Sequence, residues 1–220
     1  MKGLLLKDLR FIMQQSKMFL ILIFMVAWFM IFQGADSAPF VITYTAMMGS
    51  FFVLNTISYD EFEHSTTFLM TLPIERRDYV KEKYVFGILG IFTLWGISTA
   101  VYLLIGFGMF QEIMITALAG LVIIVASEMV MIPVQLKYGG DKGRIVIVVL
   151  VFLVMMMFFI VKSVAGRILG EGVETLILGL EAMISTVNPW AIGVVAATCL
   201  AVESYISYRI SVRMIEKKEY

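Results

Sequence analysis

The sequence predicts an all-α integral membrane protein with six transmembrane helices, an N-terminal interfacial helix and both termini in the cytoplasm. The first observation is composition: 60% of the 220 residues are apolar and 15% are charged, against about 45–50% and about 25% in soluble domains. The second and third are the segregation of the charges along the chain and the uneven distribution of Lys and Arg. Such a composition excludes a soluble enzyme, and a net charge of zero gives no reason to expect a nucleic-acid partner.

Six stretches are long enough to cross a membrane and carry only two of the 34 charged side chains, Glu128 and Glu203. A helix needs about 20 residues to cross roughly 30 Å of hydrocarbon. The apolar residues run continuously instead of alternating, which favours helices over barrel strands. The predicted spans are residues 18–35, 38–59, 84–110, 113–136, 145–161 and 190–208, all within one transmembrane domain, 1–220.

The distribution of Lys and Arg predicts the orientation. With the N-terminus inside, 15 of the 17 basic residues fall in cytoplasmic segments, and only Lys162 and Arg167 lie outside. The first 17 residues have a polar stripe with Lys7 and Arg10 opposite an apolar stripe, as in a helix lying on the membrane surface. A simple basic anchor for the first span is the alternative.

Two connections between spans are long. Residues 162–189 form the extracellular one, where Thr175–Ser185 is either a short external or re-entrant helix or an ordinary loop. Residues 60–83 form the cytoplasmic one, which Pro73 divides. It has an apolar centre and a charged rim, as protein-docking surfaces do, although a pair of helices on lipid headgroups is the alternative. The residues assigned to this surface are Asp60, Glu61, Phe62, Glu63, His64, Phe68, Leu69, Leu72, Pro73, Arg76 and Arg77.

Catalytic and metal-binding signatures are missing from the sequence. It contains no GxxxxGK[ST] phosphate loop and no HExxH, and His64 is its only histidine. The chain is therefore not expected to be an enzyme or to hold a cofactor, and any ATP that drives it must bind to another chain.

Two short motifs resemble a known family. The opening MKGLLLKDLR and the run LPIERRDYV at residues 72–80, followed by Lys83 and Tyr84, resemble type-2 ABC exporter permeases of the small six-helix Gram-positive kind. The motifs cover about the first 90 residues, and the hydropathy pattern agrees over the whole chain. The nearest resemblance is to exporters of phenol-soluble modulins and bacteriocin-like peptides.

The resemblance implies the type-2 ABC exporter permease fold in a bacterial plasma membrane. It also implies a second permease copy, as a homodimer, and two copies of a cytoplasmic ABC ATPase that bind ATP and Mg and dock under residues 60–83. The cargo it implies is an amphipathic or hydrophobic peptide, moved outward. Phe62, Phe68 and Leu72 would then enter a groove of the ATPase.

Within the spans, Glu128 and Glu203 should face protein or water. They either line one inner vestibule that attracts cationic cargo, or serve structural pairing near a kink at Pro133. Small residues four apart, Gly193, Ala197 and Ala201, predict a close helix contact within the chain or between two copies. Two other functions stay open: an ion-coupled carrier that uses the two glutamates, and a non-transport immunity or regulatory subunit.

Overall fold

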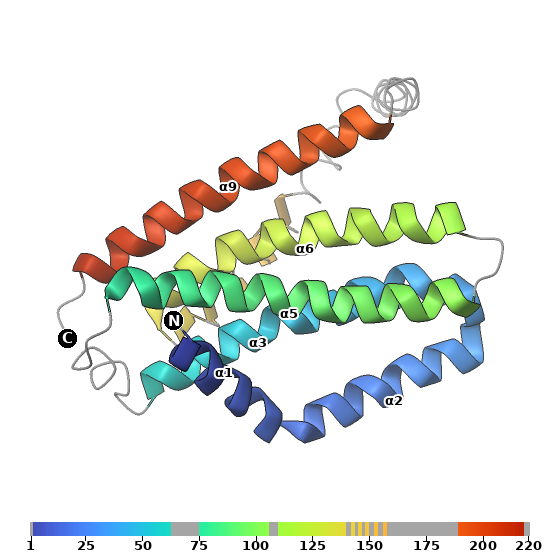
Figure 1. The fold of residues 1–220 in the computed structure, drawn as a ribbon, viewed down its shortest axis with the longest axis horizontal. Helices are drawn as coiled ribbons and strands as arrows, with labels where there is room; N and C mark the ends of the chain where they lie inside the picture. Colours follow the sequence, from blue (N-terminus) through green and yellow to red (C-terminus); the bar gives the residue numbers. More distant parts are fainter. Residues whose placement is uncertain are drawn as a thin grey trace.

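The computed structural model describes residues 2–62, 75–105, 110–139 and 189–217, with short stretches between 142 and 157. The elements that it assigns are α1 (Lys2–Gln14), α2 (Ser16–Gln33), the 3₁₀ turn η1 (Gly34–Ser37), α3 (Ala38–Phe62), α5 (Arg76–Ile105), α6 (Phe110–Tyr138) and α9 (Pro189–Lys217). These helices form an elongated bundle in which α3, α5 and α6 lie together (Figure 1). Helices α2 and α9 lie on opposite sides of this group and diverge from it.

Three helices of the described chain are long and apolar enough to cross a membrane: 38–60, 76–104 and 110–138. A fourth span is reached only if α1 and α2, which meet at a bend of 63°, are taken as one broken span. The predicted sixth span lies in α9, whose helix extends nine residues beyond the predicted end at 208. Most of 145–161 and all of 162–188 lie outside the described residues, so the six-span arrangement stays a prediction.

The connection predicted at residues 60–83 is shorter than the sequence indicates. Helix α3 continues to Phe62, and α5 begins at Arg76, eight residues before the predicted start of the third span. The added turns of α5 are helical because their charged and aromatic side chains are buried against neighbouring helices: Tyr79, Glu82 and Lys83 are all inaccessible or nearly so. Residues 63–74, between the two helices, lie outside the described part of the chain.

Helix α3 is central because it packs along both α5 and α6. At its crossing with α5, a Cβ on Gly49 would lie 2.7 Å from the backbone of Gly90, so only glycine allows this approach. At its crossing with α6, a Cβ on Gly120 would lie 2.6 Å from the Thr43 hydroxyl. These close approaches hold α3 against both α5 and α6.

Candidate functional site

A buried ionic cluster joins α1, α3 and α5 at one end of the bundle. The ammonium of Lys83, in the second turn of α5, pairs with Asp8 of α1 and lies 2.9 Å from Oδ2 of Asp60 near the end of α3. Lys7 also pairs with Asp60 and lies 3.2 Å from Asp8. The Tyr79 hydroxyl donates to Asp60 over 3.1 Å. These five residues are called the Lys83 cluster below.

The charges of this cluster depend on one another. Lys83 is fully buried, and Asp8 and Asp60 are almost fully buried. Burial alone would raise the pKa of Asp8, but the ammonium groups of Lys83 and Lys7 outweigh it and lower the pKa, so the carboxylate is ionised. Removing one partner of a buried ion pair typically costs about 3–5 kcal/mol, because the other charge is left without compensation. The cluster therefore holds α1 firmly to the first turns of α5.

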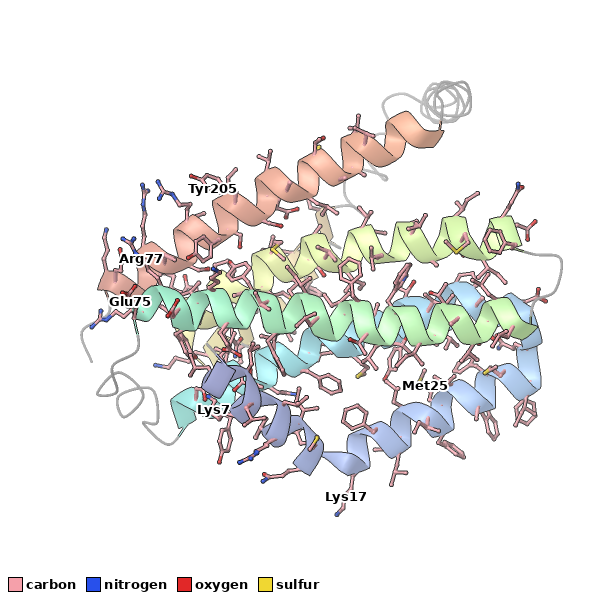
Figure 2. The ribbon with its side chains drawn as sticks, viewed as in Figure 1. Lys7, Lys17, Met25, Glu75, Arg77 and Tyr205 are labelled. Atoms are coloured by element: carbon pink, nitrogen blue, oxygen red, sulfur yellow. The ribbon has the colours of Figure 1, made fainter. Side chains whose placement is uncertain are left out.

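A second contact joins the start of α5 to the end of α9. The Arg76 guanidinium donates to the backbone carbonyls of Ile215 and Glu216, over 2.9 Å and 3.1 Å. Helix ends leave such carbonyls without intrahelical partners, so Arg76 caps α9. Arg77 pairs with the Glu216 carboxylate over 3.0 Å and stays 67% exposed (Figure 2). Exposed pairs contribute at most about 1 kcal/mol, so the Arg76 cap is the stronger part of this contact.

A hydroxyl junction joins α5, α6 and α9 deeper in the bundle. Tyr84 lies 2.5 Å from the Ser207 hydroxyl and 2.8 Å from that of Ser211. Ser207 in turn donates to the backbone carbonyl of Met129. This carbonyl has no helical donor because the residue four positions on is Pro133. The predicted effect of Pro133, a freed carbonyl one residue after Glu128, thus has a partner in α9.

The predicted docking residues fall into four groups. Six of them lie outside the described residues: Glu63, His64, Phe68, Leu69, Leu72 and Pro73. Two others, Glu61 and Phe62, are the last residues of α3. Asp60 is not on a charged rim, because its carboxylate is buried in the Lys83 cluster. Arg76 is half-buried and Arg77 is exposed, and both contact the end of α9.

The two glutamates within the predicted spans are not brought together. Glu128 is fully buried beside Gly87 of α5, where a Cβ would overlap its carboxylate, and its oxygens have no hydrogen-bond partner among the described residues. Glu203 instead lines a groove between α6 and α9. The described helices therefore do not place the two glutamates in a shared inner vestibule.

The small-residue stripe of α9 is exposed. Gly193, Ala197 and Ala201 all lie on open surface, and no atom lies within 4 Å of a Cβ built on Gly193. Within the described chain, the stripe makes no close helix contact.

Sequence reasoning missed three of the residues that form these contacts, Asp8, Tyr79 and Ser207. Asp8 offered a signal, because it is the only acid in a basic N-terminal segment and so needs a reason to be there. Ser207 offered a signal as well, because Pro133 predicts that the Met129 carbonyl lacks a hydrogen-bond donor within its own helix. No cluster of three or more His, Cys, Asp or Glu side chains in the described residues could hold a metal ion.

Comparison with known proteins identifies one family. The model of the family described as "ABC-2 family transporter protein" matches residues 3–216, nearly the whole chain. No curated protein matches the chain, and no solved structure does.

Proposed function

Because the chain belongs to the ABC-2 family of transporter proteins, it is the membrane permease subunit of an ABC transporter, and we propose that residues 60–83 couple it to the ATPase. An ABC ATPase is the partner that this membership implies. A permease of this family is a translocation component, and hydrolysis of ATP takes place on the other chain.

One observation carries the coupling proposal: the described residues on both sides of 63–74 are tied to other helices. Asp60, before this segment, belongs to the Lys83 cluster and so to α1. Arg76, after it, caps α9. A force applied to residues 63–74 by an ATPase would therefore act on α1, α3, α5 and α9 together. Rigid-body shifts of packed helices are a common way to convert such a force into opening.

In this proposal, apolar side chains of the segment enter a groove of the ATPase, and charged ones surround them. Phe62, Phe68 and Leu72 are the inserted residues, and Glu61, Glu63 and Arg77 form the rim. Asp60 and Arg76 have a different role, because their contacts within the chain leave them less free to touch a partner. They position the segment.

Phe68→Asp tests the docking role, with Phe68→Leu as the matched control. A carboxylate in an apolar groove costs several kcal/mol, so we expect Phe68→Asp to lower ATP-driven transport at least about tenfold while membrane insertion is unchanged. Phe68→Leu should keep most of the transport. Both are measured in vesicles reconstituted with the ATPase. Equal coupling of ATP hydrolysis to transport in wild type and Phe68→Asp would exclude the docking role.

We also propose the cargo, direction and assembly. The motifs shared with small Gram-positive exporters favour outward movement of an amphipathic or hydrophobic peptide by two permease copies and two ATPases, in a bacterial plasma membrane. The charged end of the bundle faces the cytoplasm in this arrangement, as the distribution of Lys and Arg favours. ATP-dependent accumulation of such a peptide in inverted vesicles is the test. Accumulation without ATP would favour the ion-coupled alternative, for which the separate environments of Glu128 and Glu203 offer no support.

A further inference from the structure

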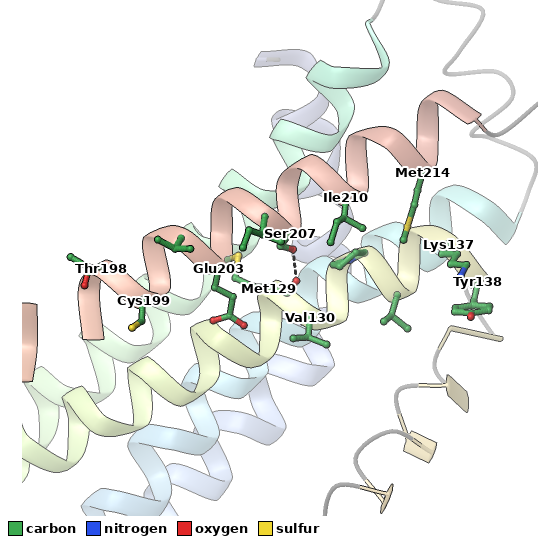
Figure 3. Close-up of a pocket in the computed structure, with 14 residues that line it drawn as sticks. Met129, Val130, Lys137, Tyr138, Thr198, Cys199, Glu203, Ser207, Ile210 and Met214 are labelled. Atoms are coloured by element: carbon green, nitrogen blue, oxygen red, sulfur yellow. Dashed lines mark hydrogen bonds between the residues drawn. The ribbon is translucent and has the colours of Figure 1, made fainter. Parts of the chain in front are cut away.

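The groove between α6 and α9 has a volume of about 740 Å³ and almost entirely apolar walls (Figure 3). Val130 and Pro133 line it from α6, and Val202 and Ile206 line it from α9. The Ser207 hydroxyl at its floor is already bonded to the Met129 carbonyl. The volume of the groove is typical of sites that bind elongated small molecules or a few apolar side chains.

Among the described residues that line the groove, Glu203 is the only acidic one, and it points from α9 toward α6 in Figure 3. It forms no ion pair with any described residue. Lys137 also lines the groove, but it lies eight residues beyond Met129, about 12 Å farther along α6. An ionised carboxylate among apolar walls within a membrane is costly unless a cation pairs with it. The groove therefore favours an occupant that is apolar along its length and positively charged at one point.

The depth of Glu203 selects the kind of occupant. It lies five residues before the predicted end of its span at residue 208, about 8 Å along the helix, and therefore below the headgroup region. A lipid carries its cationic group at the membrane surface and only hydrocarbon at such a depth. An amphipathic peptide carries cationic side chains at intervals along its whole length, so it can bring one to Glu203.

We propose that this groove is a binding site for a cationic amphipathic peptide, with a Lys or Arg side chain paired to Glu203 and apolar side chains against the walls of α6 and α9. The proposal rests on the proposed function in taking a peptide as the cargo. It adds the site, the charge requirement and the residue that reads the charge.

Cys199 makes the proposal testable in the native chain. It is the only cysteine, it is exposed, and it lies in the groove wall one helical turn from Glu203. The complex with its ATPase, in phosphatidylcholine nanodiscs without nucleotide, is labelled with a maleimide. The probe is a synthetic amphipathic helix of about 20 residues with several lysines, and the same peptide with acetylated lysines is the control. We expect the cationic peptide to slow labelling at concentrations about tenfold lower than the acetylated one requires.

Three variants separate charge from shape. Glu203→Gln should remove the difference between the two peptides. Val130→Trp, which fills the groove and leaves its charge unchanged, should weaken protection by both. Glu112→Gln, an exposed acid in the first turn of α6, should change neither. If Glu203→Gln fails to fold, the comparison of the two peptides on the wild type still decides.

Equal protection by both peptides, or protection by neither, would overturn the proposal. Its failure is distinguishable from that of the proposed function. If the peptide is transported with ATP but does not protect Cys199, the groove is not its binding site, and the proposed exporter function still holds. If the peptide protects Cys199 in a charge-dependent way but is not transported with ATP, the binding site holds and the proposed exporter function is rejected.

Discussion

Lys83 illustrates at the residue scale how a charge is accommodated inside this bundle. Its aliphatic stem and ammonium are inaccessible, and the two carboxylates of Asp8 and Asp60 come from different helices. A buried ion pair of this kind contributes little net stability compared with an apolar replacement of the whole group, but it is sensitive to the loss of a single member. Its value is that it specifies where α1 lies relative to α3 and α5.

Lys83→Met should therefore destabilise the protein by about 3–5 kcal/mol, because it removes the ammonium that pairs with the buried carboxylates of Asp8 and Asp60. Lys81→Met, two residues away on the exposed side of α5, is the matched control and should change the stability by less than about 0.5 kcal/mol. Thermal unfolding in detergent measures both. Similar unfolding midpoints for the two variants would show that the Lys83 cluster is not a structural contact.

Gly87 and Glu128 form a second sensitive pair. Gly87→Ala places a methyl group where the Glu128 carboxylate lies, and such overpacking costs typically about 1–3 kcal/mol. Glu128→Ala opens that space, so the double variant should be more stable than the sum of the two single effects predicts. The same unfolding assay gives the four values of the cycle. Additive effects would mean that the two residues do not share this space.

These residues also show the limits of sequence reasoning. The position of Asp60 just after an apolar span indicates an exposed loop, yet α3 continues past it and Asp8 and Lys83 meet it in the interior. Hydropathy measures the cost of transferring each side chain alone, so it cannot show that distant charges offset one another. The freed carbonyl at Met129 was predictable, because Pro133 removes its donor within the same helix.

At the element scale, α9 has two different halves. From Ser207 onward, Ser207, Ser211 and Ile215 are buried, and the end of the helix is capped by Arg76. Before Glu203, the side chains of residues 193–202 are mostly exposed, and the helix diverges from α6 in Figure 1. The Ser207 hydroxyl marks the boundary between the two halves. Movement of the outer half relative to α6 would change the width of the groove.

Ser207→Ala should loosen this boundary, because it leaves the Met129 carbonyl buried without a donor, at a cost of about 1–3 kcal/mol. Ser204→Ala is the matched control, since among the described residues that hydroxyl bonds only the Leu200 carbonyl of its own helix. Hydrogen exchange along α9 should be faster in the first variant than in the second. In a Pro133→Ala background, where a backbone N–H can serve Met129, the effect of Ser207→Ala should shrink. If the effect of Ser207→Ala is unchanged in the Pro133→Ala background, the role of Ser207 does not depend on the carbonyl that Pro133 frees.

At the scale of the whole molecule, the class and membership of the chain were predictable, and the arrangement of its charged end was not. Composition and two motifs led to the permease family, which the match over residues 3–216 confirms. Helices 38–60, 76–104 and 110–138 carry the predicted second, third and fourth spans. The contacts that join α1 to α3 and α5, and α5 to α9, depend on residues more than 50 positions apart, and no local pattern reveals such a pairing.

The predicted topology can be tested with single cysteines in a Cys199→Ala background. Asp36→Cys is at the turn between α2 and α3, and Lys217→Cys is at the end of α9, at the opposite end of the bundle. A membrane-impermeant maleimide should label Asp36→Cys on intact cells and Lys217→Cys only after lysis. Labelling of Lys217→Cys on intact cells would reverse the orientation and place residues 60–83 out of reach of an ATPase.

The contact of Gly49 with Gly90 has a consequence for any motion of the permease. With backbone against backbone and no side chain between them, α3 and α5 have nothing compressible at their crossing, and a shift of one must displace the other. Conformational change in this protein should therefore spare that pair. Relative motion should occur where the packing is open, at the peripheral helices α2 and α9, while α3 and α5 move together as one unit.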